Sequence, residues 1–396
     1  MANDLTFKQV STILNDIMQQ ATGQTSIAPV DTHEFVTMGQ KALLIGYDPL
    51  ATAISQVLAQ TIFSIRPYTE HFKGLRVSNQ KYGNHVRKLN VVDKEFVNDD
   101  QFSLVDGQSI DHYIVRKPEV VQTNFYGMEG YSDYITIYTD QLDNAFSGPS
   151  EFASFITMIM QNITDKQTQA RENMARMTLA NMIGAKAKVD STSVINLLSA
   201  YNQYTGSNFT TTTIKAPANY ESFIKWAYAK IKNISDMMTE RSAKFHTAIG
   251  TDVIMRHTPY DRQKLYLSSF DAQQVDARVL SGAFNPDRLK LMDYEAVNFW
   301  QNINDPAKIS VEPSYLDASG NATSGDSVVV SEIFGVLFDE EACGYTIINE
   351  RTERTPLNAR GLYYNQFWHD NKKYWNDLSE NMVVFTLADP VVTAGE

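Results

Sequence analysis

The chain contains few of the residues that most often build catalytic or metal centres. Among its 396 residues Cys343 is the single cysteine, which excludes an internal disulfide and a cysteine-based zinc site and fits a reducing compartment. The seven histidines include no pair at the i, i+4 spacing of a His-Glu-x-x-His site. We therefore expect no metal site, and we interpret Cys343 as a small buried residue.

The common catalytic and nucleotide-binding motifs are also absent. The sequence contains no Gly-x-x-x-x-Gly-Lys-Ser/Thr loop, Gly-x-Gly-x-x-Gly turn or Gly-x-Ser-x-Gly elbow. The carboxylates of Asp339-Glu340-Glu341 are of the type that binds a hard cation, but we interpret this run as a solvated strand end. We expect no catalytic residue and no cofactor, with an enzyme of dispersed site residues as the alternative.

Positive charge and long apolar runs are scarce. The 34 basic residues against 46 acidic ones leave a net charge of -12, which argues against a sequence-independent nucleic-acid binder because such binding depends on phosphate neutralisation. No apolar run is long enough to cross a membrane, and the N-terminus lacks the pattern of a signal peptide. We expect a soluble protein made in the cytoplasm, with two or three domains for this length.

One long helix organises the rest of the chain. The sequence predicts a helix over residues 149–186, with Ser147 as its N-cap, Pro149 in its first turn and Glu151 at the positive end of the helix dipole. Apolar residues recur along it at three- and four-residue steps: Phe152, Phe155, Ile156, Ile159, Ile163, Ala170, Met174 and Met177. At 1.5 Å per residue this rod is on the order of 55 Å long, which predicts a spine and not the core of a compact domain.

The first 65 residues predict an arm of separate helices. Thr6 and Gln9 resemble a capping box before an apolar stripe that ends near Gly23. A second apolar helix is predicted from about Pro49 to Phe63, after a polar connection. The apolar faces of these helices need a surface elsewhere, and an ordinary N-terminal subdomain is the alternative.

Residues 66–126 lose the helical period and predict strands in a long hairpin-like loop, with a turn at Tyr82-Gly83-Asn84 at or near its tip. Its charge is polarised. A basic run holds Arg66, Lys73, Arg76, Lys81, Arg87 and Lys88, and an acidic run holds Asp93, Glu95, Asp99, Asp100, Asp106 and Asp111. Solvated faces are one interpretation. The other is head-to-tail contact between copies, for which we predict the six basic residues with Asp93, Glu95, Asp99 and Asp100.

Before the predicted spine, an alternating strand over Tyr131–Thr139 leads into it. The region after the spine mixes helices and strands and begins with a predicted loop at residues 205–217. Helices are predicted from Phe223 to Met238, from Thr258-Pro259 onward, and from Asp276 to Phe284. A polar loop over 312–327 then precedes strands at 328–330 and 333–338. This order is typical of an α+β domain.

Aromatic residues are concentrated near the C-terminus. Six of them lie within a short segment: Tyr363, Tyr364, Phe367, Trp368, Tyr374 and Trp375. This density favours the core of a half-buried sheet, with a subunit interface as the alternative. A final apolar strand is predicted over residues 382–387.

In this order of elements the chain resembles a tailed-bacteriophage major capsid protein of the Hong Kong 97 fold, closest to those of small podophages of Gram-positive hosts. The closer resemblance lies in two stretches. They are Asp276-Ala277-Arg278-Val279-Leu280-Ser281-Gly282-Ala283-Phe284-Asn285, and Asn358-Ala359-Arg360-Gly361-Leu362-Tyr363-Tyr364-Asn365 with Phe367-Trp368-His369.

The resemblance implies an α+β fold with an N-terminal arm (1–65), an extended loop (66–128), a peripheral domain with the spine helix (129–190), an axial domain (191–345), peripheral-domain strands (346–380) and a C-terminal strand and tail (381–396). It implies copies assembled as hexamers and pentamers into an icosahedral head that contains double-stranded DNA. The implied partners are a scaffolding protein, a portal at one vertex, and head fibre or decoration proteins. Such a virion capsid would assemble in the host bacterial cytoplasm without a membrane, and an encapsulin-like cellular compartment is an alternative with the same fold.

Overall fold

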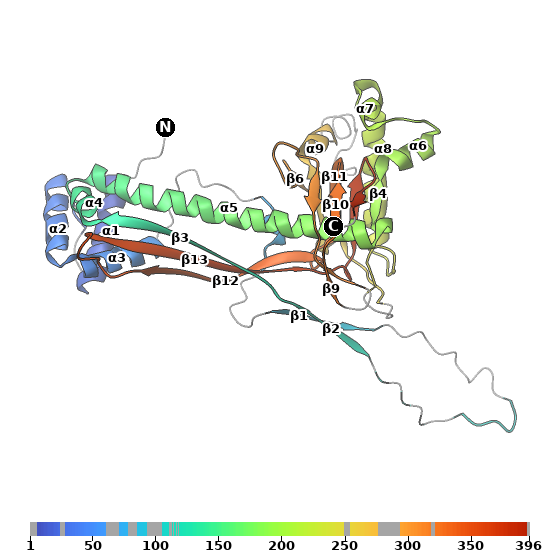
Figure 1. Ribbon diagram of the computed structural model, residues 1–396, viewed down its shortest axis with the longest axis horizontal. Coiled ribbons are helices and arrows are strands. Elements are labelled where there is room, and N and C mark those ends of the chain that lie inside the picture. The colour runs from blue at the N-terminus through green and yellow to red at the C-terminus, as the bar shows by residue number, and fades with distance from the viewer. Residues whose placement is uncertain are drawn as a thin grey trace.

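The computed structural model describes residues 6–23, 28–60, 71–77, 85–92, 105–110, 113, 115, 117, 119–248, 254–275, 294–317 and 321–393. These residues form an elongated molecule (Figure 1), with a helical group at one end, a mixed helix and sheet region at the other, and a hairpin that projects from the side. One helix, α5 (Pro149–Val189), runs between the two ends.

Nine α-helices and fifteen strands lie within the described part of the chain. The other helices are α1 (Phe7–Thr22), α2 (Thr32–Leu44), α3 (Tyr47–Gln60), α4 (Thr139–Ala145), α6 (Leu197–Thr205), α7 (Thr211–Ile214), α8 (Pro217–Met238) and α9 (Ser269–Val275). The strands are β1 (Val86–Val91), β2 (Val120–Phe125), β3 (Gly127–Tyr138), β4 (Val194–Asn196), β5 (Gln263–Ser268), β6 (Tyr294–Val297), β7 (Ile309–Val311), β8 (Tyr315–Leu316), β9 (Ala322–Thr323), β10 (Ser327–Val330), β11 (Ile333–Asp339), β12 (Cys343–Arg354), β13 (Tyr363–Asn376), β14 (Met382–Thr386) and β15 (Val391–Thr393).

The predicted long helix is confirmed and ends three residues later than expected. It has 41 residues, which corresponds to a length of about 60 Å. Pro149 occupies the first turn as predicted, but the N-cap is Gly148 and not Ser147. The Ser147 hydroxyl instead donates to the Asn144 carbonyl at 2.6 Å, which is the end of α4.

The N-terminal helices pack on the first half of α5. Leu14, Ile54, Phe152 and Ile156 belong to one buried core, together with residues of β3 and β13. Helix α2 was predicted as a polar connection, which is wrong. Asp31 caps it by accepting from the Glu34 amide at 2.8 Å, and its buried stripe includes the small residues Gly39 and Ala42, so the apolar period was weak in the sequence.

A long antiparallel sheet in the order β12-β13-β3 lies along α5 (Figure 1). The predicted strand at 131–139 is therefore confirmed within a longer β3. Side chains of β13 alternate. Tyr364 and Trp368 are buried in the core with α5, while Tyr363 and Phe367 are half-buried on the other face. The aromatic segment is thus sheet core on one face, as predicted, and accessible on the other.

A five-stranded sheet in the order β4-β14-β11-β5-β6 forms the mixed end of the molecule. Helices α6 and α8 share a buried core with it, through residues such as Phe223, Phe334 and Phe385. The predicted helices at 223–238 and strands at 328–330 and 333–338 are confirmed. Strand β14 comes last in the chain among the strands of this sheet, and it lies in the interior between β4 and β11.

The helix predicted from Thr258-Pro259 onward is wrong. Only a short 3-10 turn, Tyr260–Arg262, follows Pro259, and the chain then enters β5. Leu265 and Leu267 are buried in the core that includes α8, and Tyr266 is buried in the core that includes α5, so both faces of β5 are covered. Two-sided burial gives a continuous apolar run, which does not distinguish a strand from a helix in the sequence.

Three further loop and helix predictions have different outcomes. The loop predicted at 205–217 contains the single-turn helix α7, and the loop at 312–327 contains the short β8–β9 hairpin. The helix predicted at 276–284, together with the first stretch that carries the family resemblance, lies outside the described residues.

Strands β1 and β2 form the predicted hairpin, with Val86 opposite Phe125 and Val91 opposite Val120. The closing segment therefore lies between Val91 and Val120. The turn predicted at 82–84 lies outside the described residues, on the other side of β1, so it is not the tip.

Gly335 tests how tightly the five-stranded sheet is packed. It lies at a register shift of β11, where an added Cβ would lie 2.6 Å from Leu267 Cδ2 and 2.8 Å from the Tyr266 carbonyl oxygen. Because a backbone atom blocks this space, Gly335→Ala should lower the free energy of unfolding by about 2 kcal/mol. Urea unfolding followed by tryptophan fluorescence measures the change. Gly148→Ala is the control for the steric clash, since no atom lies within 4 Å of that Cβ and only a smaller loss at the N-cap of α5 is expected. An equal effect of both variants would contradict this account.

Candidate functional site: the ion-pair cluster at the base of the β1–β2 hairpin

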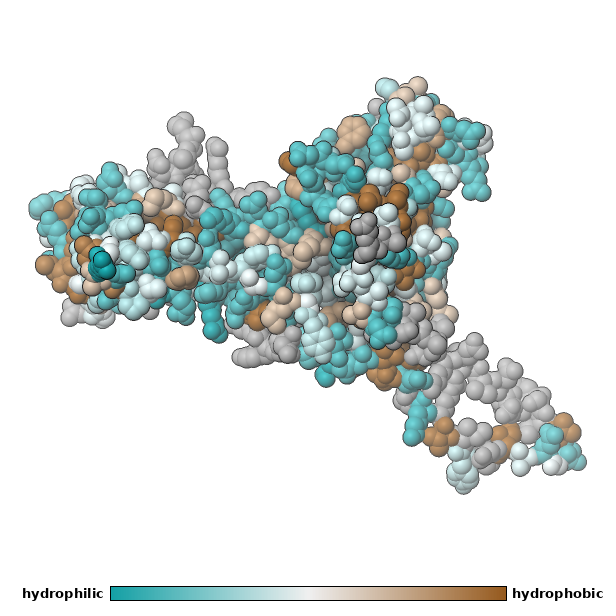
Figure 2. Space-filling model, in the orientation of Figure 1, coloured by the Kyte–Doolittle hydropathy of each residue, from teal (hydrophilic) through white to brown (hydrophobic). Residues whose placement is uncertain are grey.

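The two faces of the β1–β2 hairpin have different surroundings. Along β1 the side chains of Val86, Lys88 and Asn90 are half-buried or buried against the body of the molecule. Those of Leu89 and Val91 on the other face are 57% and 62% exposed, and Val120 opposite Val91 is 55% exposed. Figure 2 shows apolar side chains on this projecting part of the surface. The hairpin is thus attached by one face and uncovered on the other.

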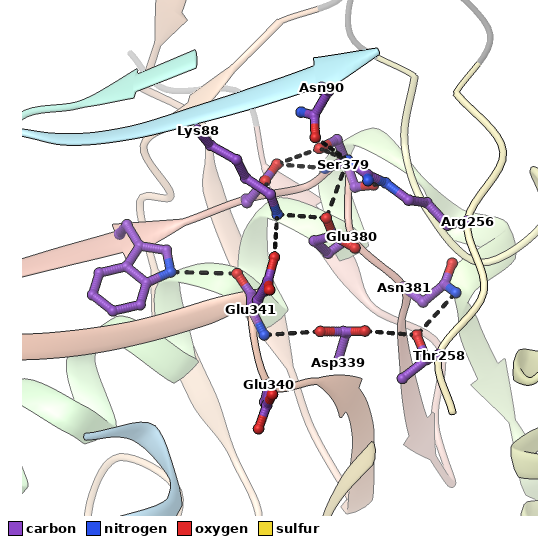
Figure 3. Close-up of polar contacts among 12 residues, drawn as sticks. Lys88, Asn90, Arg256, Thr258, Asp339, Glu340, Glu341, Ser379, Glu380 and Asn381 are labelled. Atoms are coloured by element: carbon purple, nitrogen blue, oxygen red, sulfur yellow. Dashed lines mark hydrogen bonds and ion pairs between the residues drawn. The ribbon is translucent and has the colours of Figure 1, made fainter. Parts of the chain in front are cut away.

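Lys88 attaches the hairpin through a cluster of carboxylates (Figure 3). Its ammonium lies 2.9 Å from Asp377 Oδ2 and 3.3 Å from Glu341 Oε2, and it also forms an ion pair with Glu380. Asp377 and Glu380 are almost fully buried, whereas the Lys88 side chain is 17% exposed. Buried carboxylates need such a counter-charge, so Lys88 is a structural requirement of this cluster.

Two arginines complete the cluster. Arg256 Nη2 lies 3.1 Å from Glu380 Oε1 and donates to Asn90 Oδ1 of β1 at 2.9 Å, so it also holds the hairpin (Figure 3). Arg262 Nε pairs with Glu340 at 3.0 Å, and its guanidinium also contacts Glu341. The cluster therefore joins β1 to three segments that are far apart in the sequence.

The charges of this cluster are strongly coupled. Burial alone disfavours the ammonium of Lys88, but the attraction of Asp377 and Glu380 outweighs burial and raises the pKa of Lys88. Burial raises the pKa of the Glu380 carboxyl even though Lys88 and Arg256 oppose that shift. Lys88 therefore stays charged around neutral pH, and the attachment of the hairpin is electrostatic.

A second lysine is fully buried next to this cluster. The Lys186 ammonium, near the end of α5, donates to the Leu378 carbonyl at 3.2 Å and lies 3.7 Å from Asp190 Oδ2. Burial lowers the pKa of Lys186 to about 8, and the nearby carboxylates only partly oppose this shift. Through the hydrogen bond to Leu378, Lys186 connects the spine helix to the Asp377–Asn381 turn, which contributes residues to the cluster.

The predicted contact residues have different positions. Lys73 lies in a 3-10 turn, Arg76 and Arg87 are exposed, and Lys88 is in the cluster. Six others, namely Arg66, Lys81, Asp93, Glu95, Asp99 and Asp100, lie outside the described residues.

The sequence analysis did not predict the buried positions or the ion pairs of the carboxylates in this region. Asp339 was interpreted as part of a solvated strand end, which is wrong, since it is buried and accepts from the Thr258 hydroxyl at 2.9 Å. Glu341 pairs with Lys88 and Arg262. The acidic turn Asp377 to Glu380 was visible only as a charged interruption between two apolar strands.

No reactive centre is visible among the described residues. None of their His, Cys, Asp and Glu side chains form a group of three or more that could hold a metal ion. Cys343 is buried, as predicted, and burial raises the pKa of its thiol. No helix in the described part of the chain is long and apolar enough to cross a membrane.

Comparison with known proteins identifies the family. The chain belongs to the family of Phi29-like phage major capsid proteins, whose model matches residues 10–386. This family is structural, so the enzyme alternative is excluded, and the predicted function of a phage major capsid protein is confirmed. A search of curated proteins finds no match.

Two solved structures are similar to the chain at low sequence identity. The chain is similar to a chain in the capsid structure of Staphylococcus phage Andhra, with a TM-score of 0.52 at 10% identity over 83% of this chain and 87% of that chain. A chain in the structure of the head fiber and inner core protein gp22 of native bacteriophage P68 matches with a TM-score of 0.49 at 10% identity, over 83% of this chain and 87% of that chain. The first match confirms the predicted α+β capsid fold of the Hong Kong 97 type.

Removal of Lys88 should loosen the hairpin. Lys88→Met leaves Asp377 buried without its cation and leaves Glu380 paired with Arg256 alone, which should cost about 3 kcal/mol. Hydrogen exchange of the β1 amides measures the loss as faster exchange, and adding Asp377→Asn should recover part of it. Lys225→Met is the control, because Lys225 forms an exposed pair with Glu221. Unchanged exchange in Lys88→Met would show that the cluster does not hold β1.

Lys186 should make stability depend on pH. Its folded pKa of about 8 lies below the ordinary value of 10.5, so between these values the unfolded state binds more protons and stability rises with pH. This contribution should rise by about 3 kcal/mol from pH 8 to pH 10.5, and it is measured as the difference in stability between wild type and Lys186→Met, since other groups titrate in both proteins. Urea midpoints across this range give the difference between the two proteins. Lys166→Met, at an exposed position on the same helix, should keep the wild-type rise.

Proposed function

We propose that copies of this major capsid protein assemble as hexamers and pentamers into a closed icosahedral shell around the double-stranded DNA of the phage. The observation that carries this proposal is the β1–β2 hairpin, which is held to the body on one face and presents apolar side chains on the other. An apolar face that projects from a subunit is stabilised when a neighbour covers it.

The proposed roles of the segments follow the predicted division. Residues 129–190 and 346–380, which hold α5 and the β12-β13-β3 sheet, would form the peripheral domain. Residues 191–345 would form the axial domain around each capsomer axis. Residues 1–65 would serve as an N-terminal arm, residues 66–128 as the extended loop across an adjacent subunit, and residues 381–396 as a C-terminal strand and tail.

The mechanism of assembly is additive. A shell repeats the same contact in many symmetric copies, so modest contacts combine into a stable particle without a catalytic residue. The net charge of -12 suits a container that does not bind its packaged polyanion tightly.

The further partners of the proposal rest on the family. They are a scaffolding protein during assembly, a portal at one vertex, and head fibre or decoration proteins, with assembly in the host bacterial cytoplasm. Co-expression with the scaffolding protein is therefore part of the experiment below.

The uncovered face of the hairpin should be needed for shells but not for folding. Leu89→Ser with Val91→Ser removes apolar side chains that contribute about 1 kcal/mol or more each when a neighbour buries them. Negative-stain electron microscopy after co-expression with scaffolding protein should show far fewer closed shells than wild type. The urea midpoint of the unassembled subunit should not change, because both side chains are exposed there.

Ile303→Ser is the matched control, since Ile303 is an exposed apolar residue in a turn elsewhere. Its shell yield should equal that of wild type. A normal shell yield from the hairpin variant would show that the hairpin face makes no assembly contact. Small discrete oligomers from the wild-type protein would contradict the proposed shell.

A further inference from the structure

A groove of 590 Å³ opens at the base of the hairpin, beside the ion-pair cluster. Its lining contains five cationic side chains, Arg76, Arg87, Lys88, Arg262 and Lys264, against the two carboxylates of Glu340 and Glu341. The lining therefore carries a charge of +3 on a chain whose net charge is -12, although Asp377 and Glu380 behind it neutralise Lys88. This reversal of sign marks the groove as a site for an anionic partner.

Three of these cations have no counter-charge among the described residues. Glu340 and Glu341 are paired with Arg262, and Glu341 also with Lys88. In the part of the chain that the structure describes, no carboxylate pairs with Arg76, Arg87 or Lys264. Three like charges that converge on one groove repel one another, so a bound anion stabilises them.

The three cations come from separate elements. Arg76 follows the 3-10 turn Lys73–Leu75 and forms a bridge to Tyr345, which fixes its backbone. Arg87 lies on β1, whereas Lys264 lies on β5 and its stem passes Gly74, where an added Cβ would be 3.9 Å from Lys264 Cδ. The fold therefore brings the charges together, although they are dispersed in the sequence.

The wall of the groove between these charges is partly apolar. Val77, Val86, Phe125 and Trp375 line it. An occupant that matches the groove therefore carries negative charge and apolar side chains in one short segment. A free phosphate matches only the first of these properties.

We propose that the groove binds the acidic segment of residues 93–111 from a neighbouring copy of this chain. That segment has six carboxylates, at Asp93, Glu95, Asp99, Asp100, Asp106 and Asp111, against Lys94 alone. Phe96, Val97, Phe102 and Leu104 lie between them in the sequence and suit the apolar wall. The inference rests on the proposed shell and names the surface on which the hairpin of one subunit docks.

The direction of β1 favours a neighbour over the same copy. Val86 and Lys88 line the groove, and β1 then leads away from it to Val91, before the acidic segment begins at Asp93. The hairpin projects from the body of its own subunit (Figure 1). In a head-to-tail ring each hairpin meets the groove of the next subunit, so the opposite charges of the two surfaces also fix the order of subunits.

A peptide of residues 93–111 provides a direct test without any shell. The labelled peptide should bind the unassembled full-length chain in a fluorescence anisotropy titration. Arg76→Glu with Arg87→Glu and Lys264→Glu should weaken this binding by at least about tenfold. A peptide with its carboxylates changed to amides should not bind. No binding of the natural peptide to the wild-type chain would overturn the inference.

Two controls separate this groove from general charge effects. A chain with Lys41→Glu, Lys225→Glu and Lys232→Glu has the same net charge as the groove variant and should bind the peptide like wild type. A labelled DNA duplex should bind neither chain at physiological salt. DNA binding that the groove variant alone loses, without peptide binding, would assign the groove to nucleic acid and reject the acidic segment.

A charge exchange tests the contact during assembly. The groove variant should form few shells, and so should a chain with Asp93→Lys, Asp99→Lys and Asp100→Lys. The chain that carries both sets should recover shells, because the two reversed surfaces attract each other again. Loss of shells in both single sets without recovery in the combined chain would refute the pairing. If the wild-type protein forms no shells, the proposed function is wrong, but the peptide titration still tests whether the groove binds the acidic segment.

Discussion

The burial of one 41-residue helix is the constraint on which the rest of the structure depends. A helix of this length cannot cover its own apolar residues, so other parts of the chain must cover them along about 60 Å. Helices α1 to α4 cover its first half around Phe152 and Ile156. Strands β5 to β14 and the residues around the 3-10 turn Lys73–Leu75 cover its second half around Leu179 and Ile183. The helix therefore connects two separate hydrophobic cores, and it fixes the distance between them.

The sequence predicts those helices and strands in which buried and exposed residues alternate with the period of the element. The first half of α5 and the whole of α8 have one buried stripe each, and β3 alternates between faces, so their periods are visible. Helix α2 and strand β5 were missed for opposite reasons. The stripe of α2 includes a Gly and an Ala, which weakens the period, and β5 is buried on both sides, which removes it.

The ion-pair cluster could not be predicted from periodicity or composition. Lys88 was recognised as a charged residue of the hairpin, but its partner Glu380 is 292 residues away in the sequence. Periodicity and composition report on local neighbours, whereas ion pairs between distant segments depend on how the sheets are ordered. Strand β1 and the turn after β13 belong to different parts of the fold, yet Lys88 and Glu380 meet there, and no local signal encodes this contact.

The place of β14 in the sheet order β4-β14-β11-β5-β6 has a consequence for synthesis. This strand follows all the other strands of its sheet in the chain, and it separates β4 from β11. The sheet therefore stays divided until β14 has been synthesised. Until then the edges of β4 and β11 have no partner strand, and such edges tend to pair with other chains, so the growing polypeptide must be kept from associating too early.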